Sequence, residues 1–133
     1  MPKSLTTALA VGLLVLAQAC HPGPADVNGT PGLVHQVYFW LAPGLDSAAR
    51  EDFVTGMRGL AGAPGVERVL VGTAAATPTR EVTDNTFDYF LTLHFDDVAA
   101  HDAYQVSDVH AAFVKAHEAK FREVRVFDGA VAQ

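Results

Sequence analysis

The alternation of apolar and polar residues along this chain predicts four β-strands. In three stretches apolar residues recur at every second position or form β-branched and aromatic runs, and a fourth, shorter stretch lies near the end. Both patterns are typical of strands with one buried face. The predicted strands are residues 33–41, 66–72, 87–95 and 124–127. In the first of them His35 and Val37 share one face, and Tyr38 and Trp40 share the other.

Apolar residues at helical spacing predict three helices between these strands. Phe53, Met57 and Leu60 recur in this way, and Asp46 or Ser47 is expected to cap the helix that carries them. The other two predicted helices are residues 98–105, capped by Asp96-Asp97, and residues 109–120, capped by Ser107-Asp108.

In chain order these elements are β-α-β-β-α-α-β, which predicts an α+β fold. We expect a four-stranded antiparallel sheet with helices on one face, in the split βαβ, ferredoxin-like plan. The other face of the sheet still carries apolar side chains, which a second copy of the chain would cover. The pattern therefore predicts a homodimer, with Tyr38 and Trp40 at the interface or, alternatively, stacked against a ligand.

The first 20 residues have the anatomy of a secretory signal peptide. Lys3 supplies a positive start, Leu5–Ala17 an apolar middle, and an Ala-Gln-Ala exit stands directly before Cys20. The run ending at Cys20 resembles a bacterial lipobox, in which the cysteine becomes the lipid-modified first residue, although Ala17 holds the place usual for Leu. We expect an exported protein, periplasmic or anchored to the membrane by lipid on Cys20. Ordinary secretion and an uncleaved anchor are the alternatives.

Length, composition and charge limit what the rest of the chain can be. The 133 residues suffice for one domain of ordinary size. Residues 21–32, rich in Pro and Gly, are expected to form a flexible tether, so that the domain spans residues 33–128 and residues 129–133 form a tail. A net charge of −6 argues against nucleic-acid binding, and a single cysteine excludes a disulfide framework and a cysteine-based zinc site.

The histidines do not predict a metal site. A metal ion needs three or more converging ligands, and His110 and His117 stand two helical turns apart. His94 is expected on the outer face of the sheet, and His101 and His117 are expected to be exposed among charged helix neighbours. We therefore expect no metal and no cofactor.

Several segments are similar to one known family, in the same order and at similar spacing. They are residues 35–44, the turn at residues 63–66, residues 95–97 leading to Tyr104, the stretch 107–114 and the ending at residues 126–128. Over residues 33–128 the chain resembles the stress-responsive dimeric α/β-barrel family, the Dabb domain. The resemblance implies a ferredoxin-like fold in which two copies close into a barrel.

The resemblance also implies candidate site residues. Some plant members of the family are polyketide cyclases, which close a linear chain by an intramolecular aldol reaction. They use a histidine at the start of the first strand, and a tyrosine and a histidine near the second-helix signature. His35, Tyr104 and His110 match these positions. Gly56 stands where those cyclases have a further tyrosine, which is a departure from their pattern.

The residue types at these positions suit proton transfer. A histidine titrates near neutral pH, so it can take a proton and return it. A phenol at Tyr104 can polarise a carbonyl group or orient the ring of His110. The alternative for His35 and His110 is a buried imidazole bound to backbone groups, and for Tyr104 a core aromatic.

Three functions fit the sequence. The first is a stress-linked module that binds a small apolar molecule without catalysis. The second is a cofactor-independent enzyme for aldol or proton-transfer chemistry, with His110 as general base and Tyr104 and His35 assisting. The third is a structural dimer at the cell envelope.

Overall fold

The computed structural model describes residues 30–132. The predicted signal peptide, Cys20 and most of the predicted tether therefore lie outside the described residues. Within the described part of the chain, no helix is both long and apolar enough to cross a membrane.

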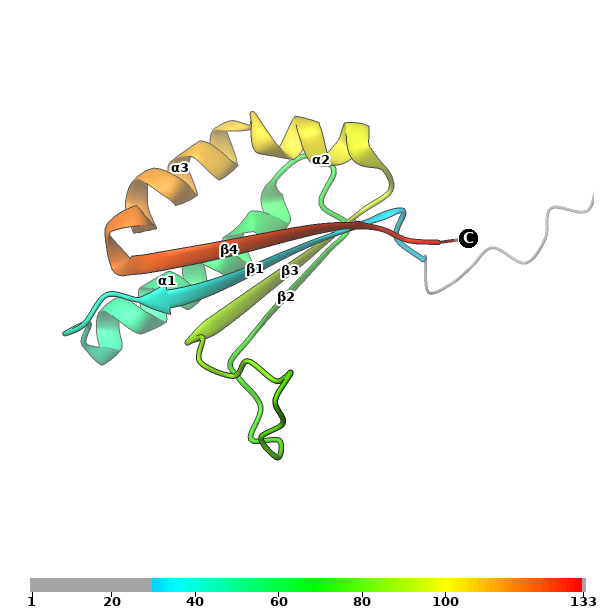
Figure 1. Ribbon diagram of the computed structural model, residues 1–133. Coiled ribbons are helices and arrows are strands. Elements are labelled where there is room, and N and C mark those ends of the chain that lie inside the picture. The colour runs from blue at the N-terminus through cyan, green and yellow to red at the C-terminus, as the bar shows by residue number, and fades with distance from the viewer. Residues whose placement is uncertain (1–29, 133) are drawn as a thin grey trace, which may run out of the picture.

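The described residues form one antiparallel sheet with all of their helices on one face, as Figure 1 shows. The strands and helices are β1 Leu33–Leu41, α1 Ser47–Gly59, β2 Arg68–Gly72, β3 Tyr89–Phe95, α2 Val98–Gln105, α3 Asp108–His117 and β4 Phe121–Ala130, with short 3-10 turns at Leu60–Gly62 and Glu118–Lys120. The strand order is β2-β3-β1-β4, and each neighbouring pair is antiparallel. This confirms the predicted four-stranded, ferredoxin-like fold.

The three predicted helix starts are confirmed by their capping bonds. The side chains of Asp46, Asp97 and Ser107 each accept a hydrogen bond from the backbone N–H three residues later, at 2.8, 2.8 and 3.2 Å. Such a bond satisfies a backbone donor that has no partner within the helix. The caps therefore fix where α1, α2 and α3 begin.

The largest difference from the predicted elements is the last strand, which is longer than residues 124–127. β4 pairs with β1 along its whole length, from Leu33 opposite Ala130 to Leu41 opposite Phe121, with a shift of register between Trp40 and Leu41. Because β4 is an edge strand, exposed side chains hide much of its alternation. β2 and β3 differ less from the prediction, since each begins two residues later than expected.

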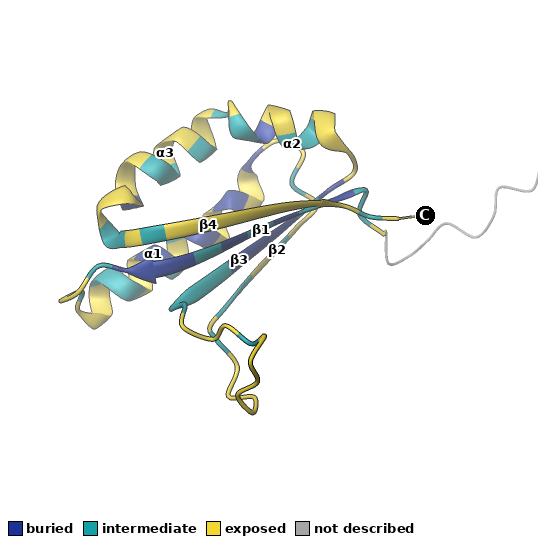
Figure 2. Ribbon diagram, in the orientation of Figure 1, coloured by how far each residue is buried: buried dark blue, intermediate teal, exposed yellow. Residues whose placement is uncertain are grey.

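The core lies between the helices and the inner face of the sheet, as the dark positions along β1, β3 and α1 in Figure 2 show. α1 contributes Phe53 and Met57, and Leu60 follows directly after it. From the sheet, the buried apolar residues are Leu33, Val37, Phe39, Leu41, Leu91, Leu93 and Phe95. The residues predicted at helical and alternating spacing therefore meet in one cluster.

His117 was expected to be exposed, and that prediction is wrong. Its ring is buried between Phe53 and Phe113, with ring centroids 5.6 and 5.0 Å away. Lys120 donates a hydrogen bond to Nδ1 of His117 at 2.9 Å, so this nitrogen has a partner although the ring is buried. The space it fills lies against Gly56, where an added Cβ would stand 2.2 Å from Nε2 of His117.

Trp40 is already covered within the single chain. Its Nε1–H donates to Oγ1 of Thr86 at 2.9 Å, and the guanidinium carbon of Arg125 lies 4.9 Å from its ring centroid. Thr86 belongs to the long loop of residues 73–88 that joins β2 to β3. The role of Trp40 at an interface stays a prediction.

Candidate functional site

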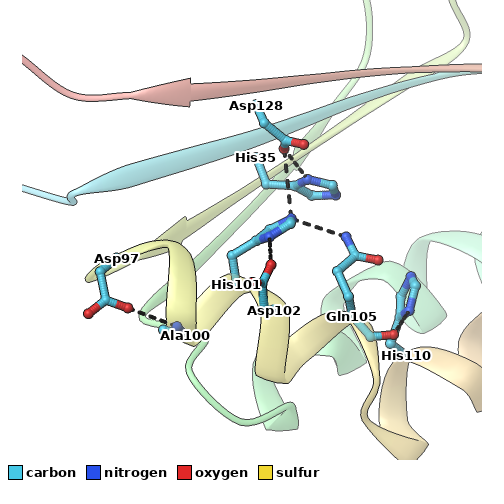
Figure 3. Close-up of polar contacts among 8 residues, drawn as sticks. All are labelled: His35, Asp97, Ala100, His101, Asp102, Gln105, His110 and Asp128. Carbon is cyan, nitrogen blue, oxygen red and sulfur yellow. Dashed lines mark hydrogen bonds and ion pairs between the residues drawn. The ribbon is translucent and has the colours of Figure 1, made fainter.

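The site is centred on His35, which is paired with a carboxylate on the neighbouring strand. His35 on β1 stands directly opposite Asp128 on β4, so their side chains lie on the same face of the sheet. Nδ1 of His35 is 2.6 Å from Oδ1 of Asp128 (Figure 3). Because a carboxylate only accepts, Nδ1–H is the donor, and the neutral ring carries its lone pair on Nε2. That Nε2 makes no hydrogen bond to any of residues 30–132.

The surroundings of His35 favour the neutral ring. The residue is 4% exposed, and this burial lowers its pKa below the ordinary value of a histidine. The hydrogen bond and charge of Asp128 oppose the shift, and His101 and His110 nearby add to it. A neutral imidazole held by a carboxylate can accept a proton on Nε2, after which the carboxylate stabilises the imidazolium.

Tyr104 and His110 lie beside His35, so the structure brings the three candidate residues together. The ring of Tyr104 on α2 is 5.9 Å from that of His35 and 4.7 Å from that of His110 on α3, measured between centroids. The tight turn between α2 and α3 makes this possible, because both the N–H and the hydroxyl of Ser107 donate to the carbonyl oxygen of Tyr104.

The hydrogen bonds and burial of these two rings define what each can offer. Burial raises the pKa of Tyr104 well above the usual value of a phenol, so its hydroxyl stays protonated. Nδ1 of His110 lies 3.1 Å from the carbonyl oxygen of Gln105, which can only accept, so Nδ1–H donates. His110 therefore holds the end of α2 in place, and Tyr104 is available as a hydrogen-bond donor.

Sequence reasoning missed His101, Asp128 and Gln105. His101 was expected to be exposed, and that prediction is wrong: its side chain is 13% exposed and its ring is 5.2 Å from that of His35. Nδ1 of His101 is 3.2 Å from Oδ1 of Asp102, and Nε2 is 3.1 Å from the amide nitrogen of Gln105 (Figure 3).

Two signals in the sequence could have found His101 and Asp128. His101 and Tyr104 are three residues apart, which places them on one face of a helix. Asp128 continues the two-residue spacing of Val124 and Val126, which places it on the same face of β4.

The cluster also offers ligand atoms to a metal ion. One ring nitrogen of His35, one of His101 and one carboxylate oxygen of Asp128 all lie within 4.8 Å of one another. These atoms come from β1, α2 and β4, so no single segment of the sequence contains the set.

A second candidate site lies on the opposite face of the sheet. An open cavity of about 880 Å³ lies between that face and the loop before β3. Its aromatic lining consists of Tyr38, Trp40, Phe87, Phe90 and Phe127. An apolar ligand would fit such a lining, and the cavity shares no residue with the His35 cluster.

Comparison with known proteins gives a family and a set of similar structures. The family model described as the stress responsive A/B barrel domain matches residues 33–131. Comparison with curated proteins gives no match.

Three similar solved structures illustrate the fold. The hydroxynitrile lyase from Passiflora edulis is 19% identical, with a TM-score of 0.66 over 78% of this chain and 97% of that chain. A Dabb family protein with a ferredoxin-like fold from Mesorhizobium loti is 20% identical, with a TM-score of 0.61 over 76% of this chain and 97% of that chain. A dimeric ferredoxin-like protein of unknown function from Jannaschia sp. is 24% identical, with a TM-score of 0.61 over 74% of this chain and 98% of that chain.

Proposed function

This chain belongs to the stress responsive A/B barrel domain family, and we propose that it is an enzyme that moves a proton on a small carbonyl compound or one of its adducts. The observation that carries this proposal is the 2.6 Å pairing of His35 Nδ1 with Asp128, which leaves Nε2 of a buried, neutral ring as a base. His35 takes this role in place of His110, because Nδ1 of His110 is bound to the backbone of α2 rather than to a carboxylate.

The proposed step needs only the side chains of the cluster. With a hydroxynitrile as substrate, Nε2 of His35 accepts the hydroxyl proton, the bond to the nitrile carbon breaks, and the electron pair leaves with cyanide while the carbonyl forms. The imidazolium, stabilised by Asp128, then protonates the cyanide. The protonated hydroxyl of Tyr104 supplies a hydrogen bond to the substrate oxygen. The activity named for the similar Passiflora edulis protein makes this substrate class the first to test.

His35→Gln is expected to lower the rate of cleavage of an aromatic hydroxynitrile by at least about 100-fold, because positioned general bases contribute on the order of 10²–10⁴-fold. The measurement is the absorbance of the released aldehyde, with circular dichroism to check that the variant is folded. The matched control is His94→Gln, since His94 lies on the outer face of the sheet. Equal rates for the wild-type protein and His35→Gln would exclude His35 as the base.

The second candidate function is the binding of a small apolar molecule in the outer cavity. Aromatic side chains line it, and Phe127 and Leu70 on the same sheet are 56% and 44% exposed in the single chain. We propose that a second copy covers this face, closing the cavity into the interior of a barrel. The dimeric ferredoxin-like proteins from Thermobifida fusca and Jannaschia sp. support a homodimer.

We also propose that the protein is exported and anchored by lipid on Cys20. The support is the sequence alone: the positive start at Lys3, the apolar stretch after it and the small residues before the cysteine. An anchor of this kind would leave residues 21–32 as a spacer between the membrane and the domain.

Native mass spectrometry of the protein purified from its own host tests the dimer, the lipid and the ligand together. We expect the mass of a dimer whose chains begin at Cys20 and carry a lipid, with an additional small apolar molecule released on unfolding. A monomer would contradict the homodimer, and chains that begin at Cys20 without added mass would contradict lipidation. A lipidated dimer that holds no ligand, together with no turnover, would favour the structural envelope role.

A further inference from the structure

Three side chains from three elements converge on one point at the end of the sheet. They are His35 on β1, His101 on α2 and Asp128 on β4, each with one nitrogen or oxygen within 4.8 Å of the other two. We propose that they bind one divalent first-row transition-metal ion of the zinc type in each protomer. The site is a binding site in its own right and does not depend on the proposed proton transfer.

The distances between the ligand atoms are near those of a metal site. Oδ1 of Asp128 is 2.6 Å from Nδ1 of His35 and 3.9 Å from Nε2 of His101 (Figure 3). Metal–ligand bonds of about 2.0–2.2 Å place neighbouring ligands roughly 3–3.5 Å apart. The carboxylate therefore needs to move away from one ring and toward the other by less than about 1 Å. One nitrogen of each ring lies within 4.8 Å of the other, so the two rings also need to draw together when the ion binds.

His101 is oriented as a ligand by its own second partner. Its Nδ1 lies 3.2 Å from Oδ1 of Asp102, which can only accept, so Nδ1 carries the proton and Nε2 carries the lone pair. The amide nitrogen of Gln105 donates to that lone pair at 3.1 Å. A carboxylate behind a histidine is the usual outer partner of a metal ligand. When a cation binds, it replaces the Gln105 amide at Nε2.

The donor set and its surroundings select the class of ion. Two imidazoles and one carboxylate suit zinc and its first-row neighbours, whereas calcium and magnesium prefer oxygen ligands. Three protein ligands leave a fourth position for water or another small ligand. The side chain of Asp128 is 46% exposed, so an ion can enter from solvent, while the rings of Phe95 and Tyr104 pack against His101 on the inner side.

Metal binding and proton transfer by His35 exclude each other. A neutral imidazole that coordinates a metal ion through Nδ1 must carry its proton on Nε2, and Nε2 is the atom proposed as the base. This consequence, unlike the site itself, rests on the proposed function. A bound zinc ion is therefore expected to stop turnover, and a chelator is expected to restore it.

Titration of the untagged protein with Co²⁺ tests the site directly, because the visible absorption of Co²⁺ reports its coordination. We expect absorption bands that saturate at one equivalent per protomer and disappear when Zn²⁺ is added. His101→Gln and Asp128→Asn are expected to weaken binding by at least about 100-fold, since even the loss of an outer partner costs about 10–100-fold. Asp102→Asn is expected to weaken Co²⁺ binding by about 10–100-fold, because Asp102 is an outer partner. His94→Gln is the control, and its affinity for Co²⁺ is expected to be unchanged.

Two results would overturn the site. One is a wild-type protein whose Co²⁺ spectrum stays that of the free ion at stoichiometric concentrations. The other is the same spectrum and affinity in His101→Gln as in the wild-type protein. Because the readout is a spectrum, it is unaffected if the hydroxynitrile is not a substrate. Asp128 is half exposed on an edge strand, so the Asp128→Asn variant is expected to fold. It therefore tests the metal site even if a substitution of the buried His35 prevents folding.

Discussion

Phe53→Ala is expected to lower the free energy of unfolding by about 3–5 kcal/mol, the range measured when a buried phenylalanine is truncated. Phe53 is fully buried, at 0% exposure, and its ring centroid lies 5.1–6.1 Å from those of five neighbouring rings. Those neighbours come from β1, β3, α3 and β4. The cavity left behind would border four elements at once, so local collapse cannot fill it.

Urea denaturation followed by circular dichroism measures this loss. The free energy of unfolding of a domain of this size is about 5–15 kcal/mol, so the variant is expected to lose a large part of its stability. The control is Val82→Ala in the loop before β3, where the side chain is 86% exposed and the effect should stay within about 0.5 kcal/mol. A midpoint for Phe53→Ala close to that of the control would mean that the packing around α1 is not as described.

Gly56→Ala is expected to destabilise the protein by about 1–3 kcal/mol, the usual cost of overpacking a core. In an unobstructed helix the same change stabilises by up to about 1 kcal/mol, so the sign of the effect is the test. The added Cβ would stand 2.2 Å from Nε2 of His117. The ring cannot easily yield, because Phe53 and Phe113 pack against it and Lys120 binds its Nδ1.

Gly59→Ala is the matched control in the same helix, since an added Cβ there meets nothing within 4 Å. Thermal denaturation should show a lower midpoint for Gly56→Ala and an equal or higher midpoint for Gly59→Ala. Combining Gly56→Ala with His117→Ala is expected to remove the clash, so that the two costs do not add. Additive costs would show that the methyl group and the ring do not meet.

The fold could be predicted from the sequence because its signals are local. The spacing of Phe53, Met57 and Leu60 defines the buried stripe of α1, and period-two alternation defines β1 and β3. The capping residues Asp46, Asp97 and Ser107 mark the helix starts by a bond to a residue three positions away. The extent of β4 could not be read in this way, because its side chains are mostly exposed and do not alternate between apolar and polar along the whole strand.

The candidate site was only partly predictable, because its contacts are non-local. The resemblance supplied His35, Tyr104 and His110, which the structure brings together. His101 looked exposed because the charged Asp102 stands next to it on the helix, yet the rotation of α2 turns its ring toward β1. Asp128 reaches His35 only through the register of the two strands, which no local pattern encodes.

The same limit explains His117 and Gly56. Charged chain neighbours such as Glu118 and Lys120 suggested a solvent-facing histidine. In the fold, Lys120 and Asp52 reach only the Nδ1 edge of its ring. Counting along the chain identified Gly56 as a departure from the cyclase pattern. The structure shows that the ring of His117 occupies the space that a side chain at this position would need.

The pairing of His35 with Asp128 joins residues 93 positions apart, at the start of the first strand and near the end of the last. During synthesis, β1 emerges long before β4, so His35 has no carboxylate partner until the last strand is complete. A chain truncated before β4 would retain all three matched residues of the family pattern and still lack Asp128, the carboxylate proposed to activate His35. The proposed chemistry is thus a property of the finished chain, and its appearance during refolding would report the docking of the last strand.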